Sequence, residues 1–82
     1  MTRNVEVYDV GIGGWIASVR EEGKTVLSTG GDPVTYYETE SFRQLTVRAL
    51  ATRPDLVPTI LSAARVRFNL TQAEAGSLCG AP

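Results

Sequence analysis

The sequence contains no histidine and a single cysteine, Cys79, among its 82 residues. Catalysis by proton transfer or by a nucleophile most often needs a positioned histidine, so its absence removes the commonest catalytic machineries. A lone cysteine forms no intrachain disulfide, and without histidine it cannot complete a zinc site. We therefore predict a protein that is not an enzyme and that uses no metal and no cofactor.

Long apolar runs are also missing. The apolar stretches are only a few residues long, whereas a helix that crosses a bilayer needs about 20. The first residues, Met1 to Asn4, are not followed by the apolar region of a signal peptide. We expect a cytoplasmic protein with no membrane partner.

The composition is that of an ordinary globular domain, with 43% hydrophobic and 21% charged residues. A chain of this length predicts one domain over residues 1–82, with a β-sheet part at 1–38 and a helical part at 41–82. Domains of this size bury only about 60 to 65% of their unfolded surface, so a homodimer interface would add stability.

Three segments of the first half alternate between apolar and polar residues as strands do. They are residues 5–10, 15–20 and 25–28. Gly23 is placed for a positive φ, which predicts an antiparallel hairpin between the last two. Residues 34–37 form either a short fourth strand or the approach to a helix. The glycine-rich residues 11–14 precede a strand rather than a helix, which favours a turn over a phosphate-binding loop.

From residue 41 the apolar period becomes helical. Ser41 and Gln44 match a capping box, and Arg53 with Pro54 ends this first helix. One apolar face collects Phe42, Leu45, Thr46, Ala49 and Leu50.

Two more helices follow. Asp55 is placed to cap the second, whose apolar stripe contains Val57, Ile60, Leu61, Ala64 and Phe68. Thr71 and Glu74 form a capping box for a third helix that runs toward Gly80. The predicted fold class is α+β, with a three- to four-stranded antiparallel sheet followed by two or three helices.

Charge is divided unevenly along the chain. Residues 1–40 hold three basic and seven acidic residues, a net charge of −4, whereas residues 41–82 hold five arginines and two acidic residues, a net charge of +3. This division suggests that the basic half meets phosphate or an acidic protein surface. The candidate contacts with nucleic acid or protein are Arg43, Arg48, Arg65 and Arg67. The alternative is that these arginines form only a solvated helical surface.

Aromatic side chains give a second set of candidates. Trp15, Tyr36 and Tyr37 belong to residue types that are enriched at protein interfaces. A stacking platform for single-stranded nucleic acid usually joins aromatics to basic residues, and the sheet half is acidic. We therefore interpret the three as contacts for a protein partner. Core packing is the alternative for Trp15, which shares a strand face with Ala17 and Val19.

Residues 61–80 carry a more specific pattern. The residues that matter are Leu70, Thr71, Gln72, Glu74, Leu78 and Gly80. This segment resembles the opening of a Cro-repressor-type helix-turn-helix domain, in which Leu78 would be a core leucine and Gly80 the glycine of the turn. Gly76 stands where the family usually has alanine. The resemblance implies that Gln72 lies near the DNA backbone and that a helix following Gly80 enters the major groove. The alternative is a capping box that serves packing alone.

The first half has a second resemblance. Residues 13–19, followed by residues 29–32 and a helix, are similar to the small β-sheet domain of HicB-type antitoxins. The proline- and glycine-rich middle of that family's pattern is missing here. The resemblance implies that the sheet domain binds a protein, as those antitoxins bind a toxin, and that a DNA-binding tail follows it.

These observations predict a non-enzymatic regulatory binding protein, antitoxin- or repressor-like. Its sheet part would bind a protein partner or dimerise, and the complete protein would bind DNA. The alternative function is a stand-alone phage-type inhibitor or adaptor that binds a host protein complex.

Overall fold

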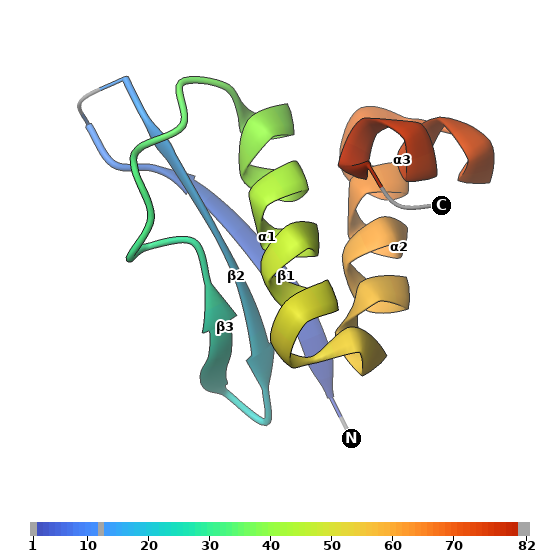
Figure 1. The fold of residues 1–82 in the computed structure, drawn as a ribbon, viewed down its shortest axis with the longest axis horizontal. Helices are drawn as coiled ribbons and strands as arrows, with labels where there is room; N and C mark the ends of the chain where they lie inside the picture. Colours follow the sequence, from blue (N-terminus) through green and yellow to red (C-terminus); the bar gives the residue numbers. More distant parts are fainter. Residues whose placement is uncertain (1, 12, 81–82) are drawn as a thin grey trace.

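The computed structural model describes residues 2–11 and 13–80, and it has the predicted α+β fold, a three-stranded antiparallel sheet followed by three α-helices (Figure 1). Ile12 of the predicted turn and residues 81–82 of the predicted helical part lie outside the described residues. The elements are β1 (Arg3–Asp9), β2 (Trp15–Glu21), β3 (Lys24–Ser28), α1 (Glu38–Thr52), the 3₁₀ turn η1 (Pro54–Leu56), α2 (Val57–Phe68) and α3 (Gln72–Cys79).

The sheet has the order β1-β2-β3, with both pairs antiparallel. The predicted hairpin between β2 and β3 is confirmed, and its turn places Gly23 at a φ of 80°. Val19 of β2 pairs with Val5 on one side and Leu27 on the other. Val19 and Ala17 are fully buried, as expected for one face of a central strand.

The possible fourth strand does not form. Only Thr35 of that segment bridges to the sheet, where the Trp15 amide donates to the Thr35 carbonyl at 2.8 Å. The reason is that α1 begins directly afterwards, with Tyr37 as its N-cap residue. The segment is therefore an approach to a helix with one strand-like contact.

The capping box predicted at Ser41 is wrong, because α1 begins three residues earlier, at Glu38. Ser41 lies inside the helix, fully buried, and its Oγ is 2.6 Å from the Thr35 Oγ1. Two acidic residues, Glu38 and Glu40, occupy the first turn, where negative charge is favourable. A tertiary hydrogen bond therefore takes the serine that the local pattern assigned to a cap.

The cap predicted at Asp55 is also wrong. A 3₁₀ turn holds Asp55, and α2 begins at Val57 with no side-chain cap at its N-terminus. The Asp55 carboxylate accepts hydrogen bonds from the guanidinium groups of Arg53 and Arg3 instead. A carboxylate that two guanidinium groups hold is not free to accept from the amides at the start of α2, which explains the outcome.

The third helix begins as predicted. The Thr71 amide donates to the Glu74 Oε1 at 2.9 Å, and the Glu74 amide donates to the Thr71 Oγ1 at 3.1 Å, so the capping box is complete. Gly80 ends the helix in the left-handed conformation, with a φ of 70°.

The helices cover one face of the sheet (Figure 1). Helix α1 packs against β2 and β3, α2 packs against β1, and α3 packs against the two other helices. The core contains Ala17, Val19, Leu27, Phe42, Leu45, Ala49, Leu56, Ile60, Ala64, Ala75 and Cys79. Leu50, predicted to belong to it, is 49% exposed because it lies one position beyond the buried face that ends at Ala49.

Candidate functional site

The three candidate aromatic residues lie close together along the chain and the sheet. Trp15 opens β2, and the bridge between Trp15 and Thr35 brings the segment before α1 against that strand. Tyr36 and Tyr37 are 68% and 67% exposed, whereas Trp15 is half-buried. Trp15 therefore supports the loop, and the two tyrosines present their rings to solvent.

The four candidate arginines do not form one surface. Arg48 is ion-paired with Asp32 and Arg67 with Glu38, so both hold parts of this domain together. Among the residues that the structure describes, Arg43 and Arg65 are in no ion pair. They lie on different helices, α1 and α2, and both are exposed.

The uneven charge along the sequence is largely balanced inside the fold. Three arginines of the second half, Arg48, Arg53 and Arg67, each pair with an acidic residue of the first 40. Their partners are Asp32, Glu21 and Glu38 in that order. Arg48 and Arg53 thus join the helical part to the residues before it, and Arg67 joins α2 to the start of α1, a third possibility beside the two that the sequence suggested.

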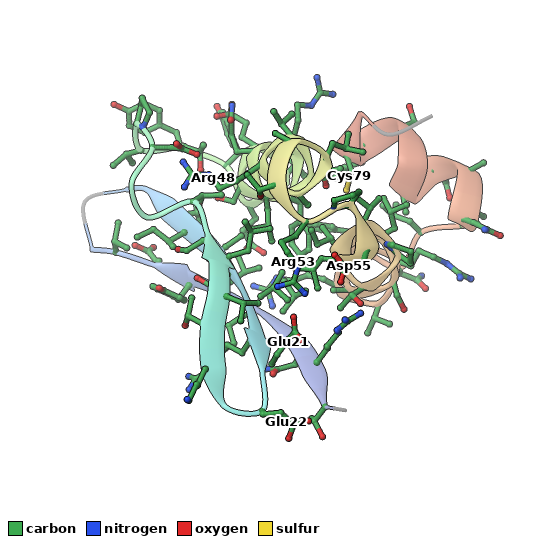
Figure 2. The ribbon with its side chains drawn as sticks, turned by 60° about the horizontal axis from the view of Figure 1, so that its bottom comes forward. Glu21, Glu22, Arg48, Arg53, Asp55 and Cys79 are labelled. Carbon is green, nitrogen blue, oxygen red and sulfur yellow. The ribbon has the colours of Figure 1, made fainter. Side chains whose placement is uncertain are left out.

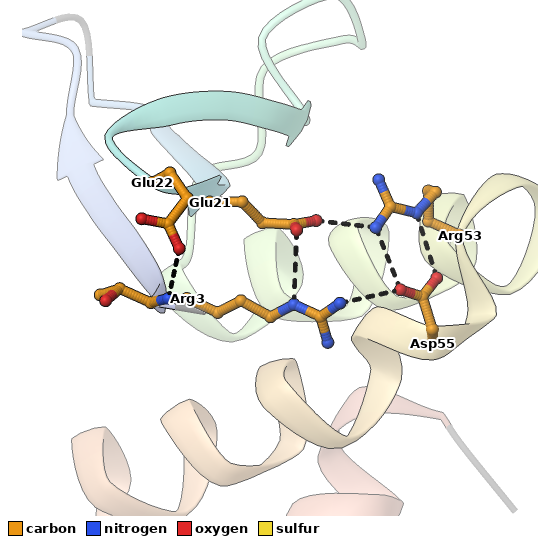
Figure 3. A network of polar contacts seen from close by, with 6 residues as sticks. Arg3, Glu21, Glu22, Arg53 and Asp55 are labelled. Atoms are coloured by element: carbon orange, nitrogen blue, oxygen red, sulfur yellow. Dashed lines mark hydrogen bonds and ion pairs between the residues drawn. The ribbon is translucent and has the colours of Figure 1, made fainter.

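The largest polar network joins both parts at one end of the molecule (Figures 2 and 3). Arg53, at the end of α1, donates from Nη2 to the Glu21 Oε1 at 2.7 Å and to the Asp55 Oδ2 at 3.0 Å. Arg3 of β1 donates from Nη2 to the same Asp55 oxygen at 3.2 Å. The Arg3 Nε lies 3.6 Å from the Glu21 Oε2.

This network acts as a clamp rather than as an acid–base pair. Hydrogen bonds from Arg53 hold the pKa of Asp55 below its ordinary range, and the hydrogen bonds that Arg53 donates to Asp55 and Glu21 raise the pKa of Arg53. A general acid at neutral pH needs a carboxyl whose pKa is raised. The arrangement therefore stabilises charges at the junction of sheet and helices.

Acid should weaken this clamp. Because the folded-state pKa of Asp55 is depressed, its contribution to stability is present above the pKa of an unfolded aspartate, about 3.9, and disappears as the pH falls through the folded-state value. We expect Asp55→Asn to lower the urea midpoint at neutral pH, and the difference from wild type to vanish in strong acid. Glu40→Gln removes one exposed charge outside the network and serves as the control. A deficit for Asp55→Asn that persists unchanged in strong acid would contradict the clamp.

A groove runs between β1 and α2. Its β1 wall contains Arg3, Asn4, Val5 and Val7, its α2 wall contains Pro58, Thr59, Ser62, Ala63, Val66 and Arg67, and Phe42 of α1 also lines it. Val66 is 83% exposed although it is apolar. No sequence pattern predicted this groove, because the position of β1 at the edge of the sheet follows from strand order and not from any local motif.

The outer edge of β1 presents unpaired backbone groups. Two hydrogen bonds bracket β1, from the Glu22 amide to the Thr2 carbonyl and from the Val10 amide to the Gly14 carbonyl, each 3.0 Å long. Antiparallel pairs alternate, so the even-numbered residues of β1 bond to β2, and the backbone of Val5 and Val7 points outward.

Residues 61–80, the segment whose sequence resembles a helix-turn-helix opening, fall on α2 and α3. Asn69 ends α2 in the left-handed conformation, with a φ of 54°, and the Thr71 cap opens α3 two residues later. Gln72 is exposed at the start of α3. Leu78, expected in the core, is only partly buried.

The buried positions of α3 are Ala75 and Cys79. Figure 2 places Cys79 beside α1. Burial raises the pKa of the Cys79 thiol, and a neutral, buried thiol is unreactive. Cys79 therefore serves packing.

Compared with known proteins, the chain matches no family model, no curated protein and no solved structure. Within residues 2–11 and 13–80, no helix is long and apolar enough to cross a bilayer. The same residues contain no cluster of three potential metal ligands. The candidate surfaces are therefore the exposed tyrosines, the groove beside β1, and the exposed Arg65 and Gln72.

Proposed function

We propose that this chain is a non-enzymatic regulatory protein of the cytoplasm whose sheet part binds a protein partner. The observation that carries the proposal is the pair of exposed tyrosines beside the half-buried Trp15. Tyrosine and tryptophan supply much of the binding energy at protein interfaces, and the bridge at Thr35 holds the loop that carries the tyrosines. Val34, 43% exposed, extends the apolar surface.

We further propose that α2 and α3 are the first part of a DNA-binding element that the complete protein uses. The support is the capped turn between the two helices, with Arg65 and Gln72 exposed near it. Arginine and glutamine side chains are common donors to phosphate oxygens, which position a protein on the duplex. Base recognition would come from a helix after Gly80, as the resemblance implies.

Site-specific photo-crosslinking tests the protein-binding part. A photoreactive phenylalanine analogue at Tyr36 should trap one discrete partner in cells of the native host. The same analogue at Leu50, which is also exposed, should trap none. Identical products from both positions, or no product from Tyr36, would contradict the proposal.

A gel-shift measurement tests the DNA-binding part. The complete protein should retard duplex DNA, with an affinity that falls steeply as salt rises because phosphate contacts release counterions. Arg65→Ala should weaken binding and reduce the salt slope by about one if Arg65 contacts a phosphate. If the complete protein ignores DNA at low salt, a stand-alone inhibitor or adaptor that uses the same tyrosines becomes the better interpretation.

A further inference from the structure

We infer that the groove between β1 and α2 binds an extended segment of a partner protein, which joins the sheet as a fourth strand beside β1. The inference rests on the proposed protein-binding function and deepens it, because it names a second contact region and the chemistry of the segment that fits there.

The helical layer is wider than the sheet. Neighbouring helices pack about 8–10 Å apart, whereas neighbouring strands lie about 4.8 Å apart, so two helices side by side cover about four strands. This sheet has three strands. Helix α1 packs against β2 and β3, and α2 packs against β1. The part of α2 that has no strand beneath it therefore lies at the outer side of β1, where Figure 1 shows α2.

The backbone of the β1 edge is free to pair. Val5 and Val7 direct their amide and carbonyl groups away from β2, and among the described residues no other hydrogen bond engages them. An added strand would pair with these groups, which is how extended peptides bind to exposed sheet edges. The opposite edge is less suitable, because β3 is shorter, carries Lys24 and faces a register shift in β2.

The walls of the groove indicate the chemistry of the segment that fits there. Side chains on one face of an added strand would lie over Ala63 and Val66, so apolar residues fit at alternate positions. The charged residues of the lining are Arg3 and Arg67, and within the described residues no carboxylate joins them there. Each guanidinium has more donors than its ion pairs within the domain use, which favours acidic residues at the ends of the segment.

A second copy of this chain fits the groove less well. Pairing through β1 across a two-fold axis would bring a second α2 toward the space that the first α2 already overhangs. An extended segment brings no second helix and needs only the width of one strand. We therefore assign the groove to an extended segment of a different protein.

Selection from a phage-displayed library of random peptides of about ten residues, long enough for one strand, tests the inference with the full chain immobilised. The selected peptides should alternate apolar residues and carry aspartate or glutamate near an end. Synthetic copies should shift the amide resonances of Val5 and Val7 in the wild-type protein. Val66→Glu should weaken their binding about ten-fold, because it places a charge in the apolar wall.

Val47→Glu is the matched control, because Val47 is also an exposed valine of a helix, 56% exposed on α1, and lies outside the groove. The inference is overturned if the selected peptides lack the alternation, if Val66→Glu and Val47→Glu bind them equally, or if Val5 and Val7 do not respond. Sedimentation that shows a dimer lost in Val66→Glu would also overturn it, in favour of a second copy. The crosslink at Tyr36 is independent, so its success beside a failed groove leaves the proposed function standing.

Discussion

Replacing Phe42 with alanine should cost about 3–5 kcal/mol of unfolding free energy, the usual range for a buried phenylalanine. Phe42 is almost completely buried, and its ring meets that of Phe68 edge to face, with centroids 5.5 Å apart. The substitution removes this aromatic contact and leaves a cavity between α1, α2 and the sheet. Small domains have a total unfolding free energy of about 5–15 kcal/mol, so the variant should unfold at a much lower urea concentration than the wild type.

Leu50→Ala is the control for this prediction. Leu50 lies on the same helix and was also predicted to be in the core, but half of its side chain is exposed. We expect Leu50→Ala to lose much less unfolding free energy than Phe42→Ala. Equal losses from the two variants would contradict the observed position of α1 on the sheet.

Replacing Gly14 with alanine should cost about 1–3 kcal/mol, as overpacking does in a filled site. A Cβ at Gly14 would lie 2.0 Å from the Val34 Cγ1 and 3.3 Å from the Thr35 carbonyl oxygen. Either Val34 or the backbone bridge between Trp15 and Thr35 has to shift. Since that bridge positions Tyr36, the variant should also lose yield in the Tyr36 photo-crosslink, measured beside its urea midpoint.

Gly31→Ala provides the matched comparison. Gly31 lies between β3 and α1, in the connection that also holds Val34 and Thr35, has no positive φ, and has no atom within 4 Å of an added Cβ among the described residues. We expect this variant to equal or slightly exceed the wild type in stability, because alanine restricts the unfolded chain. If Gly31→Ala destabilises as much as Gly14→Ala, contact with Val34 is not the cause.

Sequence patterns predicted the elements whose signals are local. The hairpin at Gly23 and the capping box at Thr71 depend on residues within one turn, and both formed as expected. The predicted caps at Ser41 and Asp55 failed because distant groups compete for the same side chains. Asp55 pairs with Arg3, 52 residues away, and no pattern around Asp55 contains that information.

The candidate site residues also differ in how much their sequence context predicts. The exposure of Tyr36 and Tyr37 agrees with their predicted availability for contact, whereas Arg48 and Arg67 are held in internal ion pairs. A sequence reports that an arginine is present but not which carboxylate lies opposite it. The groove depends on which strand lies at the edge and on how far α2 extends beyond it, and both are properties of the assembled layers.

The ion pairs between the two halves also limit how this domain can be recombined with others. A foreign sheet placed before these helices would leave Arg48 without Asp32 and Arg53 without Glu21, whereas Arg67 would keep Glu38, the first residue of α1. The sheet and the helices are therefore not interchangeable modules, and a functional chimera has to transfer each arginine together with its acid.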